Sequence, residues 1–450
     1  MAAQMSTMKK PIVSICIIML LCSSVMFTGC FNQQKPVVTP KTTKEIAVDI
    51  VTLLMQQNYS GVYSYFNTSI SLKVTLTQFQ AAWIQVLNVS GNLTHIVSER
   101  SANESGSSVE YVTCNFSKSP QLDIKIVFNA QLKVIGLNVV PPKAAYTVPS
   151  YVNQSMFTEQ SVIVGSSPWT LPGNLTIPKG TGPFPAVVLV QGSGPNDQDE
   201  TIGQNKPLKD LAWGLASQGI VVLRYVKRTK QYPQQSAQIQ NFTVEDEVID
   251  DVIAAIDVLT ASPVVDHSLI FVLGHSLGGY LAPRIATQDP RIAGLIIMAG
   301  PTRHLEDLIL EQVQYLAKLS GTNQSAQIAM VEQGIEKIKT LNFTDNESVF
   351  GSPGSYWRDL ATYDPVATAQ TLHLPMCIMQ GLRDYQVTAE DFTRWNQTFS
   401  GNSMVTLKTY ASLNHLFIPG VGTPTNTEYL IPGHVSVDVV NDIAAWVHAR

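Results

Sequence analysis

The chain has 450 residues, of which 45% are hydrophobic and 14% charged, and its formal net charge is −5. This composition is typical of a globular protein and excludes a largely disordered chain. The negative net charge, with no run of basic residues beyond the extreme N-terminus, argues against a nucleic-acid partner. At this length we expect two folded units in addition to a targeting segment.

The N-terminus predicts a secretory signal peptide over residues 1–29. Two lysines precede an uncharged apolar stretch, residues 12–27, which is shorter than the roughly 20 apolar residues that span a bilayer. The stretch ends in the small residues and cysteine of "FTGC". An uncleaved membrane anchor remains the alternative. A linker rich in Gln, Pro and Thr follows over residues 30–43.

The "FTGC" segment resembles the lipobox of prokaryotic lipoproteins, in which the cysteine is lipidated and becomes the first mature residue. Phe27 stands where that pattern usually has a Leu-type residue. The resemblance implies lipidation of Cys30. We therefore expect an exported protein, held as a cell-surface lipoprotein on the outer face of the membrane.

Cysteine usage indicates neither a disulfide framework nor a cysteine-based metal site. Three of the five cysteines lie in the N-terminal segment, and only Cys114 and Cys377 remain in the folded part, far apart in the sequence.

Residues 44–142 predict a small α+β domain. Apolar residues recur at helical spacing up to about residue 87, and the stretches "VEYVTCNFS", "LDIKIVFN" and "LKVIGLNVV" then alternate apolar and polar residues as antiparallel strands do. No His, Asp or Glu residues cluster there in a way that suits chemistry, so we expect a spacer or a substrate-presenting module. A second linker, residues 143–156, follows.

Residues 157–450 predict an α/β doubly wound, mostly parallel sheet. The segments "PAVVLVQG", "GIVVLRY", "SLIFVLG", "IAGLIIMAG" and "PMCIMQG" are continuous apolar runs that alternate with helical patterns, after a leading antiparallel pair of strands. Long helical patterns over about residues 301–365 interrupt this alternation after the sixth strand. We expect that insertion to form a helical cap over the carboxyl edge of the sheet.

The segment "FVLGHSLGGYLAPRIA" predicts a nucleophilic serine, Ser276. It matches G-x-S-x-G between a strand and a helix, where glycines two positions either side allow a strained turn to expose the hydroxyl. His275 is expected to pack rather than to take part in catalysis.

A serine nucleophile needs a base and an acid that orients the base, and in this architecture they follow in the order acid, then histidine. Asp384 follows the penultimate strand, and His415 lies between the last strand and the final helix. We predict that these two complete a triad with Ser276. The alternatives are His434 for the base, and Asp364, Glu390 and Asp391 for the acid; the three acidic residues are better read as turn or helix-start residues.

An oxyanion hole needs two backbone N–H donors. Leu277, directly after the nucleophile, supplies one, and Ser193 in the turn of "VVLVQGSGPNDQDE" supplies the other. Asp197, Asp199 and Glu200 in the same loop are expected to make structural hydrogen bonds, because no matching set of metal ligands occurs elsewhere. We therefore predict no metal site.

Together, "QGSGPNDQDE", "GHSLGGYLAPRIA", "GLRDYQV" and "LNHLF" resemble secreted serine esterases of the α/β-hydrolase superfamily, the group related to bacterial esterase D. The likeness covers about residues 157–450, and "LEDLILEQVQYLA" fits the helical cap of that group. Val226 departs from the pattern, which usually has Asp there. The segments "NYSGVYSYFN" and "VIGLNVVPP" resemble a small domain of unassigned function found ahead of secreted hydrolases.

The resemblance implies a carboxylesterase acting on small-molecule esters of short to medium acyl chains, without a cofactor. The same residues would also serve a thioesterase or a serine aminopeptidase, which would need acidic groups such as Glu306 or Glu311 to hold the substrate amine. An inactive, surface-anchored binding module is a third possibility. The intact set of Ser, Asp and His argues against it.

Overall fold

The computed structural model describes residues 41–104, 106–118, 121–140, 142, 146–320 and 324–450. It divides the chain into two units, Met1–Ala145 and Tyr146–Arg450. The expected signal peptide, the lipidation site Cys30 and nearly all of the first linker lie outside the described residues. Among the helices of the described ranges, none is long and apolar enough to cross a bilayer.

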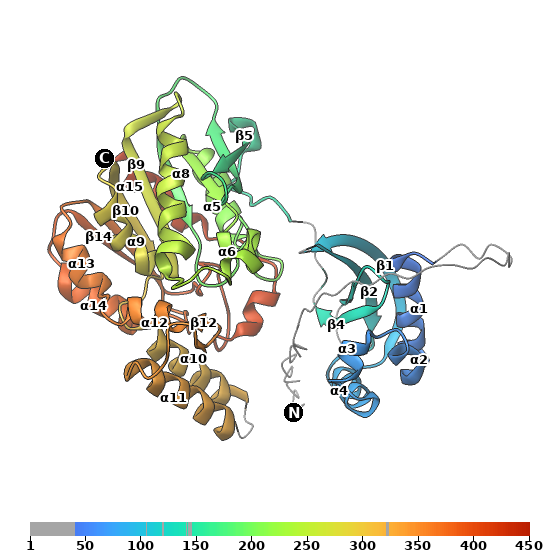
Figure 1. Ribbon diagram of the computed structural model, residues 1–450. Coiled ribbons are helices and arrows are strands. Elements are labelled where there is room, and N and C mark those ends of the chain that lie inside the picture. The colour runs from blue at the N-terminus through green and yellow to red at the C-terminus, as the bar shows by residue number, and fades with distance from the viewer. Residues whose placement is uncertain (1–40, 105, 119–120, 141, 143–145, 321–323) are drawn as a thin grey trace, which may run out of the picture. The chain divides into compact units, whose positions relative to one another are not determined.

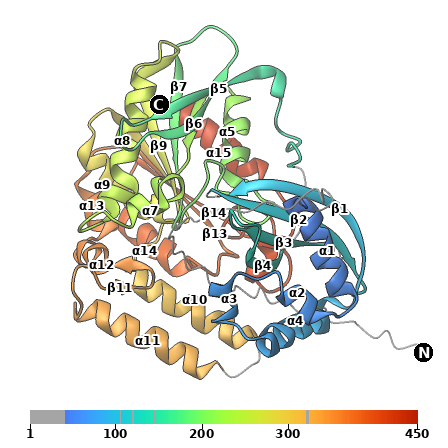
Figure 2. The same ribbon diagram turned by 45° about the vertical axis from the view of Figure 1, so that its right-hand side comes forward.

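The first unit combines helices with an antiparallel sheet of order β1-β2-β3-β4 (Figures 1 and 2). Its elements are α1 (Thr43–Met55), α2 (Tyr59–Tyr63), α3 (Thr68–Ser71), α4 (Leu76–Ser90), β1 (Leu93–Glu104), β2 (Ser107–Phe116), β3 (Leu122–Phe128) and β4 (Val134–Val140). Helix α1 begins at a capping box in which Thr42 and Glu45 satisfy each other's backbone N–H groups. Its apolar stripe, which includes Ile50 and Leu54, packs in one core with Ile124 and Ile126 of β3.

Strand β1 is an element that the sequence pattern did not indicate. It pairs with β2 along its length, but most of its side chains are exposed or half-buried. A strand with one weakly buried face lacks the alternation of apolar and polar residues by which strands are predicted.

The second unit contains an eight-stranded sheet of order β14-β13-β10-β9-β7-β8-β6-β5. Its strands are β5 (Phe157–Val164), β6 (Leu171–Pro178), β7 (Phe184–Val190), β8 (Val221–Tyr225), β9 (Val265–His275), β10 (Ile292–Met298), β13 (Met376–Gly381) and β14 (Val405–Tyr410). Strands β5 and β6 form the leading antiparallel pair, and the pairs from β8 to β14 are parallel. The predicted doubly wound, mostly parallel sheet is confirmed.

Helices cover both faces of this sheet. They are α5 (Pro207–Ala216), α6 (Arg228–Gln231), α7 (Pro233–Ser236), α8 (Asp250–Thr260), α9 (Leu277–Gln288), α14 (Ala389–Phe399) and α15 (Val437–His448). In strand β7, Val188 and Val190 face a core that includes residues of α8 and α9, whereas Val187 and Leu189 face a core with α5 and α15. Figure 1 shows α8 and α9 lying over one face. Because both faces are buried, the strands read as continuous apolar runs.

The segment between β10 and β13 departs from the strand–helix alternation. It contains α10 (Leu305–Ser320), α11 (Ser325–Lys339), the short hairpin β11 (Ser348–Val349) and β12 (Ser352–Pro353), α12 (Gly354–Leu360) and α13 (Pro365–Thr371). Helices α10 and α11 lie side by side in both views (Figures 1 and 2). This insertion belongs to the same compact unit as the sheet, so its side chains can help to line a site there.

Candidate active site

Ser276 lies on a sharp turn between strand β9 and helix α9. Its backbone has φ 53° and ψ −115°, a conformation that costs a residue with a side chain about 1–3 kcal/mol and that clusters at functional sites. Backbone atoms approach each other closely at this turn. A Cβ on Gly274 would lie 2.2 Å from the carbonyl oxygen of Gly278, and one on Gly278 would lie 2.5 Å from that of Val190. Glycine at both positions is therefore a steric requirement of the turn.

Asp384 and His415 are brought together from the loops after β13 and β14. The ring Nδ1 of His415 lies 2.6 Å from Oδ2 of Asp384, and both residues are buried. Oδ1 of Asp384 accepts hydrogen bonds from the backbone N–H groups of Gln386 and Val387, at 2.8 and 3.0 Å. A carboxylate held in this way accepts a hydrogen bond from Nδ1–H, so the basic nitrogen of His415 is Nε2.

The ring of His415 lies against the ring of His275, and the two ring centroids are 4.7 Å apart. Within the described residues, no hydrogen bond joins the Ser276 hydroxyl to His415. Such bonds are often long before substrate binds and shorten in the reacting complex. The structure thus pairs the predicted acid with the predicted base and brings the base against His275, the residue that precedes the predicted nucleophile.

The alternative acids and the rival histidine have other partners. His434 faces Asp210 at 3.2 Å and Thr147 at 3.1 Å. Asp364 caps α13 by accepting from two backbone N–H groups of its first turn. Asp391 is fully buried and accepts from the backbone N–H of Thr302 at 2.8 Å, so it fixes the loop after β10 rather than merely favouring the start of its own helix. None of these contacts involves His415.

The loop after β7 approaches the nucleophile closely. A Cβ on Gly192 would lie 3.1 Å from the Cβ of Ser276. Ser193, Ser276 and Leu277 line the same pocket. The N–H of Leu277 belongs to the first turn of α9, where backbone N–H groups lack partners within the helix. Both predicted oxyanion donors therefore belong to segments that border the nucleophile.

A buried ion pair between Glu200 and His275 joins three parts of this site. The Glu200 carboxylate accepts from the N–H of Gly192 at 2.7 Å and lies 3.0 Å from Nδ1 of His275. Nε2 of His275 lies 2.8 Å from the carbonyl oxygen of His415. A carbonyl oxygen and an ionised carboxylate can only accept, so this pairing favours a proton on each ring nitrogen, which is the cationic form of His275. Sequence reasoning assigned Glu200 to loop hydrogen bonds and His275 to packing, and no local pattern indicated their pairing.

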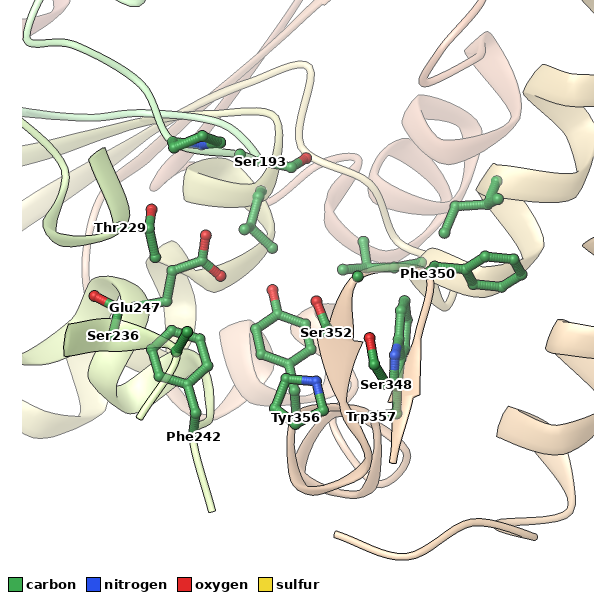
Figure 3. A pocket seen from close by; sticks show the side chains of 18 of the residues that line it. Ser193, Thr229, Ser236, Phe242, Glu247, Ser348, Phe350, Ser352, Tyr356 and Trp357 are labelled. Atoms are coloured by element: carbon green, nitrogen blue, oxygen red, sulfur yellow. The ribbon is translucent and has the colours of Figure 1, made fainter. Parts of the chain in front are cut away.

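A pocket of about 920 Å³ opens at the nucleophile. The insertion contributes apolar side chains to its lining, namely Leu305, Leu308, Ile309, Phe350 and Trp357. Figure 3 shows Phe350 and Trp357 on one side of the pocket and Thr229, Ser236 and Glu247 on the other. A concave, largely apolar site with a few polar groups is typical of small-molecule binding.

The acidic residues near this pocket are already paired or lie elsewhere. Glu311 forms an ion pair with Arg303 at 2.7 Å, and Glu306 is buried outside the pocket lining. Glu247 lines the pocket but pairs with Lys227 at 2.6 Å. These contacts do not favour a site for a substrate amine. In the described part of the chain, no group of three or more His, Cys, Asp or Glu residues is arranged to hold a metal ion.

Comparisons with known families match both units. Residues 47–137 match a family described as a protein of unknown function, DUF3887, and residues 213–432 match the prolyl oligopeptidase family. The chain is also 35% identical to esterase EstD of Thermotoga maritima over 424 residues, which are 94% of this chain and 97% of that esterase.

Solved structures of low sequence identity are similar as well. Est1E from Butyrivibrio proteoclasticus is 15% identical with a TM-score of 0.43, covering 64% of this chain and 99% of its own. An esterase of Pyrococcus furiosus is 15% identical with a TM-score of 0.42, covering 69% of this chain and 97% of its own. These likenesses are too distant to bear on function.

The ion pair of His275 predicts a pH-dependent contribution to stability. Burial alone would lower the pKa of His275, but the Glu200 carboxylate and the carbonyl of His415 outweigh burial and raise it. Because the folded pKa exceeds the unfolded value of about 6.5, the stabilisation is fully present below that pH and is lost as the pH rises through the folded pKa. The difference in free energy of unfolding between the natural chain and His275→Gln should therefore shrink from pH 6 to pH 9 in urea titrations.

His267→Gln is the matched control, because His267 lies exposed on the same strand, β9. The difference in free energy of unfolding between His267→Gln and the natural chain should stay small at every pH. A His275→Gln difference that is constant or grows with pH would contradict the cationic state of the ring.

Proposed function

Since the chain belongs to the family of esterase EstD and is a carboxylic ester hydrolase of the α/β-hydrolase superfamily, we propose that it cleaves esters of short to medium acyl chains through an acyl-enzyme on Ser276. The observation that carries this proposal is the Asp384–His415 pair beside the strained turn of Ser276. The prolyl oligopeptidase match alone would also fit a peptidase. The paired state of the acidic residues favours the ester substrate.

The reaction proceeds in two half-reactions. Oγ of Ser276 attacks the ester carbonyl as Nε2 of His415 takes its proton, and the electron pair of the carbonyl bond moves to oxygen. His415 then gives the proton to the leaving alcohol as the C–O bond breaks, leaving an acyl ester on Ser276. Water, deprotonated by His415, attacks that ester, and collapse of the second tetrahedral intermediate releases the carboxylic acid and returns the proton to Ser276.

Two features of the site stabilise the transition states. The backbone N–H groups of Ser193 and Leu277 donate to the oxygen on which negative charge develops. Asp384 holds the imidazole in the Nδ1–H tautomer and stabilises the imidazolium that forms at His415. The apolar side of the pocket takes the acyl chain, because each methylene that is buried there contributes about 0.8 kcal/mol.

Replacement of the nucleophile tests the proposal most directly. Ser276→Ala should abolish labelling by a fluorophosphonate probe and lower kcat for p-nitrophenyl acetate by about 10³-fold or more, as loss of a triad member does. Ser268→Ala is the matched control, since Ser268 is exposed on the same strand, β9. Equal labelling or turnover by the natural chain and Ser276→Ala would remove the assignment.

The two candidate histidines give opposite predictions. His415→Ala should lower kcat by about 10³-fold or more, because it removes the imidazole that is proposed to take the proton from Ser276. His434→Ala should keep most of the activity, because His434 binds Asp210 instead. Initial rates with p-nitrophenyl acetate measure both. The assignment of the base is wrong if His434→Ala is the variant that loses activity.

Acyl-chain preference should follow the apolar side of the pocket. We expect kcat/KM for p-nitrophenyl esters to rise from acetate to chains of about four to eight carbons, because each added methylene can contact the apolar lining of the pocket. Ile309→Phe, which fills part of the lining, should lower the octanoate-to-acetate ratio of kcat/KM by about tenfold, the loss expected for one or two buried methylenes. Leu319→Phe, at a 41% exposed position of the same helix, is the control. An unchanged ratio in Ile309→Phe would show that the acyl chain binds elsewhere.

A further inference from the structure

The N–H of Ser193 shares a peptide plane with the carbonyl of Gly192. In a planar, trans peptide these two groups point in opposite directions. Whatever fixes the carbonyl of Gly192 therefore also fixes the direction of the Ser193 N–H. The charged side chain that contacts this carbonyl comes from a different segment of the chain.

The ammonium of Lys227 makes that contact. Lys227 follows strand β8 and is only 2% exposed, and its Nζ donates to the carbonyl oxygen of Gly192 at 2.9 Å. The amide of Asn196 donates to the same oxygen at 3.1 Å, and the backbone N–H of Lys227 donates to the carbonyl of Asn196 at 3.1 Å. The loop that carries Ser193 is thus tied to Lys227 through both backbone and side chain.

Glu247 holds the ammonium from the pocket side. Its carboxylate lies 2.6 Å from Nζ of Lys227 and is nearly buried. It comes from a five-residue π-helical turn, Glu245–Ile249, and such turns are frequent at functional sites. Tyr356, on helix α12 of the insertion, lines the same pocket as Glu247, and the pKa of its hydroxyl is raised by burial, the larger cause, and by the Glu247 carboxylate. Figure 3 shows the Glu247 carboxylate and the Tyr356 hydroxyl facing the same part of the pocket.

We propose that Lys227 is a positioning residue of the oxyanion hole: its ammonium holds the carbonyl of Gly192 so that the Ser193 N–H faces the oxygen on which negative charge develops. Glu247 in turn holds the ammonium at that carbonyl. A cation on the carbonyl also polarises the peptide and makes its N–H a stronger donor. This inference rests on the proposed function, since it assigns a role to the Ser193 N–H.

A purely structural role would account for only part of the geometry. A buried lysine needs a paired carboxylate, and Glu247 alone meets that need. The contact with Gly192 goes further, because it bears on one of the two peptides whose N–H groups are assigned to the oxyanion hole. A structural role predicts a loss of stability without a selective loss of transition-state binding, and the proposed role predicts that selective loss.

The test replaces Lys227 with a side chain of similar length and no charge. Lys227→Met should lower kcat/KM for p-nitrophenyl butyrate by about 10- to 100-fold, somewhat less than the 10²–10³-fold cost of removing an oxyanion donor outright. The inhibition constant of a short alkyl trifluoromethyl ketone should rise by the same factor, because Oγ of Ser276 adds to the ketone carbon as its proton passes to His415, and the ketone oxygen becomes an oxyanion in the hole. The inhibition constant of the alcohol of equal chain length, which forms no oxyanion, should stay within about twofold. Lys230→Met, at an exposed position three residues on, is the control.

The double variant Lys227→Met/Glu247→Gln removes the carboxylate that the single variant leaves unpaired, and it serves if the single variant does not fold. It should show the same selective loss. Either variant overturns the inference if it folds and keeps natural kcat/KM, or if it loses activity while trifluoromethyl ketone affinity is unchanged. Ser276→Ala separates this outcome from failure of the proposed function, because it should be inactive whether or not Lys227 positions the hole.

Discussion

The buried pair of Glu200 and His275 is the interaction on which the rest of the site depends. Glu200 accepts from the N–H of Gly192, and His275 donates to the carbonyl of His415. His275 also precedes Ser276 in the chain. One ion pair therefore sets the relative positions of the oxyanion loop, the nucleophile turn and the segment that carries the base. Glu200 and His275 contact backbone groups of Gly192 and His415. A change of side chain in those two segments therefore could not supply the same contacts.

Gly192 is held from both ends by groups of opposite charge. Its N–H meets the Glu200 carboxylate and its carbonyl meets the Lys227 ammonium. A Cβ at this position would lie 2.8 Å from the Glu200 carboxylate and 3.1 Å from Ser276, so only glycine allows the approach. An oxyanion hole acts through donors that are oriented before the substrate arrives. Holding Gly192 at its N–H and at its carbonyl fixes the direction of the peptide that carries the Ser193 N–H.

The sequence indicated candidate site residues through their places at the ends of strands. Ser276 and Asp384 follow the buried apolar runs of β9 and β13, and His415 follows β14, whose side chains are half-buried or exposed. In a parallel sheet the carboxyl ends of the strands lie at one edge. The pairs Glu200–His275 and Lys227–Glu247 could not be predicted in the same way, because their partners are far apart in sequence and obey no periodicity. Strand β1 escaped prediction for a different reason, since a largely exposed strand shows little alternation.

Burying the charges of Lys227 and Glu247 costs free energy, so their presence calls for a reason other than stability. Taking a lysine and a glutamate out of water costs several kcal/mol per ion, and apolar replacements of similar volume are often as stable or more so. Stability alone therefore gives no reason for Lys227 and Glu247 beneath the pocket. What an apolar pair could not do is hold a carbonyl oxygen in a fixed direction, since that needs a donor. The arrangement around Gly192 is accordingly better explained by the orientation of one peptide bond than by the stability of the fold.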